Sequence, residues 1–172
     1  MNGSGKFYGK YRGIVVNNVD PMQLGRLLVQ VPEVSSISQW AEPCAPLAGP
    51  PGPPMGVYLV PPVGTGVWVE FEKGDPDHPI CVGCRWGGQS GIPIQAWAGL
   101  PTSPSIVLQT LGQNSIVISD VPGAKGGIML KTPSGAMISI SESSIIISNG
   151  QGAIIALDGP SVGINNGALK VP

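Results

Sequence analysis

The sequence has few charged residues. Asp, Glu, Lys and Arg make up 11% of its 172 residues, and the formal net charge is −1, whereas about a quarter of an ordinary soluble domain is charged. So few Lys and Arg leave no broad basic surface for phosphate groups or anionic lipid. Nucleic acid is therefore not an expected partner.

Cysteine and histidine are also scarce. Three Cys make no even disulfide framework, so reduced thiols are expected, and a single His limits general-base chemistry. No apolar run reaches 18 residues, and the opening "MNGSGKFYGKYRG" lacks the apolar segment of a signal peptide. We expect synthesis in the cytoplasm without a signal peptide.

Aromatic residues are missing after Leu100, where Ile, Ser, Gly and Asn dominate. All four Trp, all three Tyr, both Phe, the His and the three Cys precede that point. Gly and Pro together supply 45 residues, but 42% of the chain is apolar and periodic, which argues against disorder. The composition predicts an all-β chain with a globular part and a repetitive part.

The first part contains strongly alternating segments. "GRLLVQVPEV" (25–34) places Leu27, Val29 and Val31 on one face, after "YRGIVVNN" (11–18) and a turn cluster. "GVWVEFEKGDPDHPICVGCRW" places Val67 and Phe71 on one face with Val69, and then turns back. Five or six short strands with long loops predict a small barrel of the OB type.

The second part repeats short apolar runs, and the later runs are eight or nine residues apart. Burial of one apolar side chain stabilises the folded chain by ~1.5–3 kcal/mol, while ordering the backbone of each residue costs roughly 1–2 kcal/mol of conformational entropy. With one or two buried residues per repeat, a single chain therefore gains no net stability. This spacing is too short to wind round a single-chain core. It predicts one side of a three-chain prism, a β-helical needle intertwined in a homotrimer. The predicted trimer core is Ile116, Ile118, Ile128, Leu130, Ile138, Ile140, Ile145, Ile147, Ile155, Leu157, Val162 and Ile164.

Three motifs in order resemble a known family. They are "GKYRGIVVNNVDPMQLGRLLVQVPEV", then "PPVGTGVWVEFEKGDPDHPICVGCRWG", then the Ile/Ser/Gly repeats. The chain is similar to the central spike of contractile injection systems, which includes phage baseplate assembly protein V and the spike of type VI secretion. The motif match covers about residues 8–88, and the rest matches in architecture.

The resemblance implies a domain plan and a structural role. We expect an extension (1–8), an OB-fold domain (9–90), a linker (91–105) and a trimeric β-helix (106–172). The OB domain would dock on the baseplate hub, and the needle would pierce the target cell envelope when the sheath contracts. The chain would be a component of a virion tail or injection particle made in a bacterial cytoplasm, with no enzymatic activity and no cofactor.

The sequence departs from some relatives in ways that predict its partners. About 15 linker residues stand where other members carry a lysozyme domain, and about eight residues precede the first strand where type VI spikes carry a hub domain. We therefore expect a separate hub protein. No His follows residue 78, so the metal-binding apex of some spikes is not expected, and we favour a separate PAAR-like tip protein.

Several residues outside this plan could bear chemistry. Cys44, Cys81, Cys84 and His78 form the one complete set for a zinc ion. Residues i and i+3 of a strand face opposite sides, however, so Cys81 and Cys84 are not expected to grip one metal. Packed cysteines and no metal site are the prediction.

The acidic residues are also assigned structural positions. Asp75, Asp77 and His78 are assigned to a hairpin loop, as is Asp20 before Pro21. Glu42, Glu70 and Glu72 could serve as glycosidase carboxylates. We instead place Glu70 and Glu72 on one strand face toward solvent or a neighbouring subunit, so no catalytic residue is predicted.

Two other functions fit parts of the sequence. A trimeric fibre or receptor-binding protein would normally carry a bulkier, aromatic tip after the repeats. An OB-fold module for single-stranded nucleic acid or glycan would need stacking aromatics beside Lys or Arg, and Trp68 and Trp86 have no basic cluster near them in the sequence.

Overall fold

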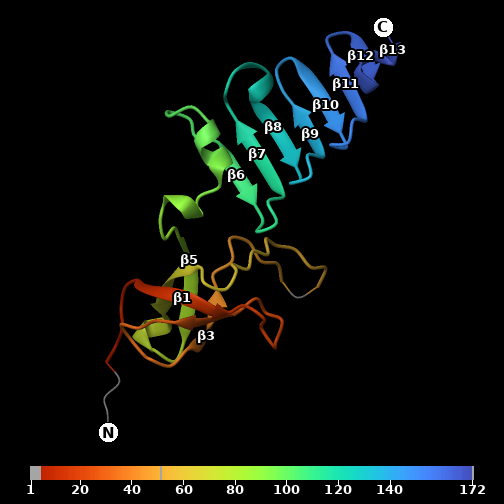
Figure 1. The fold of residues 1–172 in the computed structure, drawn as a ribbon. Helices are drawn as coiled ribbons and strands as arrows, with labels where there is room; N and C mark the ends of the chain where they lie inside the picture. Colours follow the sequence, from red (N-terminus) through yellow and green to blue (C-terminus); the bar gives the residue numbers. More distant parts are fainter. Residues whose placement is uncertain (1–4, 51, 172) are drawn as a thin grey trace. The chain divides into compact units, whose positions relative to one another are not determined.

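The computed structural model describes residues 5–50 and 52–171, and its regular elements there are strands and short 3-10 turns (Figure 1). The chain forms two compact units, Met1–Gln89 and Ser90–Pro172. Within the described residues, no helix has the length and apolar character needed to cross a membrane. The all-β class predicted from composition is confirmed.

The first unit is a closed five-stranded barrel with the strand order β1-β2-β3-β5-β4. Strands β3 and β5 pair in parallel, and the other neighbours pair antiparallel. The predicted OB-like barrel is therefore confirmed. Its elements are β1 (Tyr11–Asn17), β2 (Leu27–Gln30), β3 (Gln39–Pro43), β4 (Gly66–Phe71), η1 (Glu72–Gly74) and β5 (Pro79–Arg85).

Alternating side chains fill the barrel. The residues predicted to face inward from 25–34 and 66–71 are all buried, and Val67 and Val69 have no exposed surface. Phe7, Tyr11 and Phe71 close one part of this core with ring centroids 5.5–6.0 Å apart. The buried core is Val15, Leu27, Val29, Val31, Ala41, Val67, Val69, Phe71 and Cys81.

Asp20 organises the loop between β1 and β2. Its carboxylate accepts hydrogen bonds from the backbone N–H groups of Met22 (3.0 Å), Leu24 (2.9 Å) and Arg26 (3.2 Å). It also pairs with the guanidinium of Arg26 at 2.8 Å, and that guanidinium lies over the Trp40 ring. The hydrogen bond from the Arg26 side chain lowers the pKa of Asp20 far below its ordinary value of 3.8.

We predict that this carboxylate makes the barrel sensitive to acid. Because the folded-state pKa is depressed, its stabilising contribution is complete above pH 3.8 and is lost as the pH falls below that value. Asp20→Asn should lower the thermal midpoint at pH 7, and its deficit relative to the native sequence should shrink below pH 4. Thermal unfolding of both proteins from pH 7 to pH 2.5 measures this, and a pH-independent deficit would contradict it.

The second unit contains one antiparallel sheet in which each strand pairs with its neighbours in the sequence, from β6 to β13 (Figure 1). Two short turns, η2 (Gln89–Gly91) and η3 (Ile94–Ala98), precede it. The sheet elements are β6 (Ile106–Gln109), β7 (Ser115–Ser119), η4 (Gly123–Lys125), β8 (Gly127–Lys131), β9 (Met137–Ile140), β10 (Ser144–Ser148), β11 (Ile154–Asp158), β12 (Ser161–Ile164), η5 (Asn165–Gly167) and β13 (Leu169–Val171).

A single chain forms an antiparallel meander, and the β-helical intertwining predicted for three chains is not seen within it. Short polar turns reverse the chain after each strand, so it folds back beside itself and does not continue round an axis. Asn149 shows how such a turn is built, because its side-chain oxygen accepts the N–H groups of Gln151 and Ala153. Ser, Asn and Gly residues at the strand ends thus turn the chain within one sheet.

Gly127 is required where β7 leads into β8. Its φ is +88°, and a Cβ there would lie 1.9 Å from the carbonyl oxygen of Ile140 on the neighbouring strand β9. A side chain at this position would have to displace the β8–β9 pairing. The sheet register therefore depends on this glycine.

We predict that Gly127→Ala destabilises the second unit by at least about 2 kcal/mol, from left-handed backbone strain plus the clash. Gly163→Ala is the matched control, because it lies in the same sheet and its nearest neighbour to a new Cβ is 4.0 Å away. Thermal unfolding followed by far-UV circular dichroism compares the two. Equal midpoints for both variants would contradict the prediction.

Candidate functional site

The second sheet carries two parallel ladders of large aliphatic side chains on one face. Residues directly opposite each other on paired strands share a face, and Ile138, for example, pairs with Leu130 on one side and Ile147 on the other. All twelve residues of the predicted trimer core fall in these ladders. The first ladder is Ile106, Ile118, Ile128, Ile140, Ile145, Leu157 and Val162, and the second is Leu108, Ile116, Leu130, Ile138, Ile147, Ile155, Ile164 and Leu169.

We call this surface the ladder face. The prediction missed three of its residues, Ile106, Leu108 and Leu169. The alternation in "SIVLQ" was the available signal for the first two. Leu169 lies in a three-residue strand, LKV, after a turn with left-handed Asn165 and Asn166, and so short an alternation is a weak signal.

The ladder face is incompletely covered within one chain. Exposure of its central Ile and Leu residues runs from 38% at Ile145 to 45% at Ile147. At the ends of the sheet it is higher, with 64% at Ile106 and 55% at Leu169. Full burial of such a side chain contributes ~1.5–3 kcal/mol, so covering the part that is still exposed would stabilise an assembly by ~0.6–1.2 kcal/mol per side chain. A continuous exposed apolar surface of this kind marks an interface.

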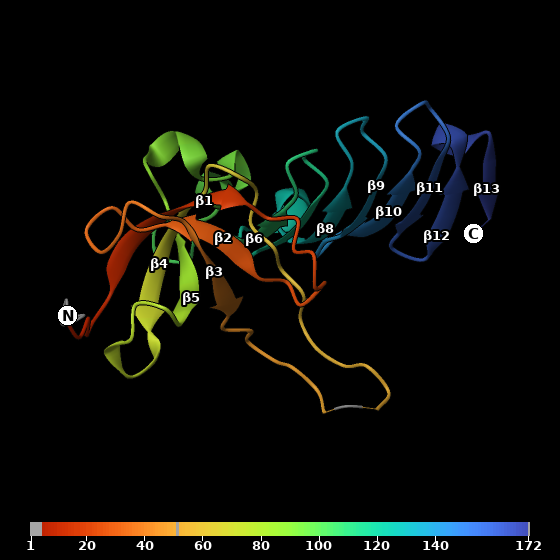
Figure 2. The ribbon, with the colours of Figure 1, turned by 90° about the horizontal axis from the view of Figure 1, so that it is seen from below.

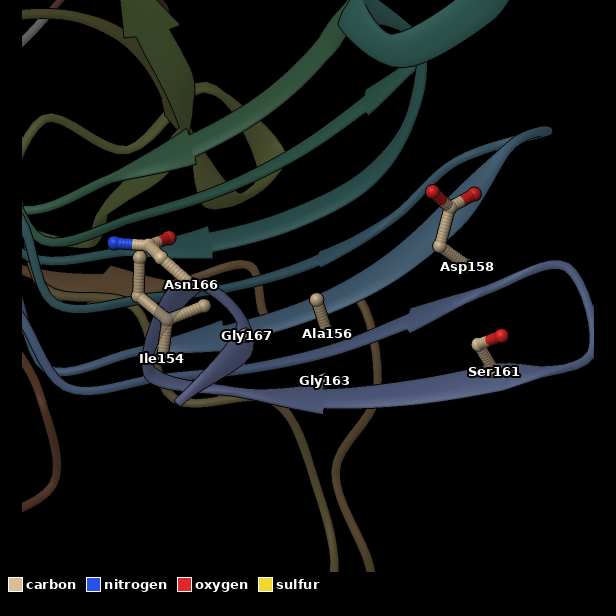
Figure 3. Close-up of a pocket in the computed structure, with 7 residues that line it drawn as sticks. All are labelled: Ile154, Ala156, Asp158, Ser161, Gly163, Asn166 and Gly167. Atoms are coloured by element: carbon tan, nitrogen blue, oxygen red, sulfur yellow. The ribbon is translucent and has the colours of Figure 1, made fainter. Parts of the chain in front are cut away.

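The opposite face is smaller and more polar. Its central row, in paired register, is Val107, Val117, Met129, Ser139, Ile146, Ala156 and Gly163. Near its end lies a shallow hollow of about 230 Å³ that Figure 3 shows, with Ile154, Asp158, Ser161 and Asn166 around Ala156, Gly163 and Gly167. A single carboxylate in an open hollow is not a catalytic arrangement.

Two family models match the chain, and together they cover most of it. Residues 11–86 match the type VI secretion system/phage-baseplate injector OB domain, and residues 105–170 match the phage baseplate V C-terminal trimerisation domain. The chain belongs to the phage baseplate V and type VI spike family. None of the curated proteins searched matches it significantly.

Membership fixes the coarse role of this spike-family protein. It is a structural component of a phage baseplate or related injection particle, and its second domain makes it a homotrimer. The domains of this family are structural components rather than known enzymes. The ladder face lies within the matched trimerisation domain, from β6 to β13.

The three thiols of this spike protein lie closer together than the sequence indicated. An irregularity in the β4–β5 pairing adds a residue on β5, so Cys84 pairs with Val67 and Cys81 with Val69. Because those valines share a face, the prediction that the two thiols face opposite sides is wrong. Cys44, Cys81 and Cys84 all line one groove on the barrel, between β5 and the loop that follows β3.

These thiols form no metal-binding set with His78. His78 is not among the residues that line their groove, and its imidazole lies 3.6 Å from the Asp75 carboxylate. Within 5–50 and 52–171, no three His, Cys, Asp or Glu side chains are grouped to hold a metal. Burial raises the pKa of the Cys81 thiol, so it is protonated at neutral pH.

The carboxylates singled out in the sequence are dispersed. Glu70 pairs with Lys10 on the barrel surface. Glu72 lies in the turn η1, where its carboxylate is 4.0 Å from Lys73, so the expectation that Glu70 and Glu72 share one strand face is wrong because β4 ends at Phe71. The hairpin-loop assignment of Asp75 agrees with the structure, since its carboxylate accepts the N–H of Asp77. That hydrogen bond lowers the pKa of Asp75.

The barrel also offers little for stacking nucleic acid bases. Arg12 lies over the ring of Trp68 at 5.9 Å, and Arg26 lies over Trp40 at 5.5 Å. Each ring is therefore covered on one side by its own arginine, and Arg26 is neutralised by Asp20. These contacts do not favour the nucleic acid alternative.

We predict that a charge in the ladder face abolishes trimer formation, whereas a charge one residue away does not. Ile138→Asp would place a carboxylate among aliphatic side chains at a cost of at least about 3 kcal/mol per chain if the face is buried. Ser139→Asp is the control, since Ser139 lies on the opposite face of β9. Native mass should fall from about three times 17.6 kDa to one chain mass in the first variant only. A trimeric Ile138→Asp protein would contradict the prediction.

Proposed function

We propose that this protein is the central spike of a contractile injection machine, in which three chains bury their ladder faces against one another to form the needle. The observation that carries the proposal is the ladder face itself, with its two registered columns of exposed Ile and Leu within the trimerisation domain. Three such sheets enclose a closed prism, in which every ladder side chain meets apolar neighbours.

The prism accounts for a mechanical role. Bending a needle made of three hydrogen-bonded sheets would require the ladders to separate over many strands at once. The needle is thus stiff enough to transmit the thrust of sheath contraction and to pierce the target cell envelope. No bond is made or broken by the chain in this action.

Each unit has its own partner in this proposal. The barrel docks on the baseplate hub, which holds the spike in line with the tail tube. In the sheet of the second unit, strand β13 pairs on one edge alone in the part of the chain that is described, with β12. A PAAR-like tip protein covers this end of the three sheets and protects their exposed strand edges.

The proposal is tested in the particle that carries the protein. Ile138→Asp and Ser139→Asp chains replace the native chain in the producing cells, and particles are counted by electron microscopy and assayed on target cells. Loss of spike-bearing particles and of injection with Ile138→Asp alone is the expected result. Normal injection by particles that carry Ile138→Asp would overturn the proposal.

A further inference from the structure

The barrel carries a second uncovered apolar surface, distinct from the ladder face. The described residues of the loop between β3 and β4, 44–50 and 52–65, extend away from the barrel strands (Figure 2), and we call them the arm. The arm and the adjoining β1–β2 loop surround a groove of about 760 Å³. The groove is lined by Leu24, Gly25, Leu27, the arm residues 44–48, 54–61 and strand residues of β3 and β5, including Cys81 and Cys84.

The arm is ordered by its own contacts. Ala48 and Gly56 form a β-bridge, and hydrogen bonds run from Gly49 N–H to the Met55 carbonyl (2.8 Å) and from Val57 N–H to the Leu47 carbonyl (3.0 Å). Tyr58 lies against Gly25, where a Cβ would approach its ring to 3.0 Å. A hairpin with this many prolines and internal bonds is already organised for binding, which lowers the entropy lost on contact.

The surface of the arm is apolar and lacks charge. From Pro43 to Val69 the sequence has no Asp, Glu, Lys or Arg, and no charged residue lines the groove. The most exposed apolar side chains here are Tyr58 (75%), Leu59 (69%) and Met55 (60%). Charge depletion over such an area is typical of obligate interfaces between subunits rather than of transient ones.

We propose that the arm and groove pack against neighbouring copies of this chain, which makes a second trimer contact at the level of the barrel. The trimerisation domain supplies the reason for choosing this occupant. It joins three chains, and the residues between Arg85 and Ile106 tether each barrel to that domain. The barrels are thereby held at high effective concentration, so a contact too weak to form alone becomes occupied. The inference rests on the trimer of the proposed function.

The thiols in the groove report on this contact. In a single chain Cys44 and Cys84 are exposed, whereas Cys81 is buried. If neighbouring chains cover the groove, the barrel contact must open before a bulky maleimide can reach Cys44 or Cys84. Alkylation of these two thiols should therefore be about tenfold slower in the native full-length trimer than in a Met55→Asp/Leu59→Asp variant. Ile37→Asp is the control, since Ile37 is 73% exposed and does not line the groove.

Native mass recorded on the same samples separates this inference from the proposed function. A trimer whose two thiols react as fast in the native sequence as in the double variant overturns the barrel contact and leaves the needle intact. A trimer whose thiols become protected only when hub protein is added overturns it as well and assigns the surface to the hub. A monomer overturns both proposals.

A second measurement does not depend on tolerance of the two Asp residues. A photoreactive phenylalanine analogue in place of Leu59 should crosslink between chains, and mass spectrometry should find it joined to residues 19–27 or 44–61 of another copy. Crosslinks within one chain only would overturn the proposal.

Discussion

The ladder face cannot be covered by the chain that carries it. Each strand of the second sheet pairs with its sequence neighbours alone, so the chain builds a single layer with one strongly apolar side. A single layer has no second sheet or helix to pack on, and a stable domain ordinarily needs two. The apolar surface must therefore be matched by other copies. Trimerisation is in this sense a condition for the fold of the second unit as well as a property of the assembled particle.

The barrel also has to cover the apolar face of its sheet, and it does so within one chain. Its five strands close on themselves, so the inward side chains of β2 (Leu27 and Val29) and of β4 (Val67 and Val69) meet inside one chain and are buried. Closure also removes free strand edges. The first unit thus needs no partner for its core, and most of the large apolar side chains that it exposes lie in loops, with Ile14 and Val16 of β1 as exceptions. Because its core is buried within one chain, the barrel can fold whether or not the proposed contact at the arm forms.

The period of the sequence determined how much of this could be predicted. Once a segment is a strand, parity alone assigns faces, which is why all twelve ladder residues and the inward faces of β2 and β4 were placed correctly on common faces. Parity fails wherever a residue is inserted, and the irregularity opposite Trp68 therefore reversed the expected relation of Cys81 to Cys84. Parity also does not show whether the next strand continues round an axis or folds back beside the previous one. Winding around an axis and folding back in one sheet share the same spacing, and only the turn geometry separates them.

The row opposite the ladders differs from them in side-chain size and polarity. In the trimer proposed above, the ladder faces turn inward and this row lies on the outside. From β6 to β12 it consists of Val107, Val117, Met129, Ser139, Ile146, Ala156 and Gly163, and the same face carries Lys131 and Asp158. This face therefore mixes large, small, polar and charged side chains, while the ladders consist of Ile, Leu and Val alone. In the trimer proposed above, the ladder faces have to fill the space between three chains, so their side chains are uniformly aliphatic and large, whereas a face turned to water can take small, polar and charged side chains.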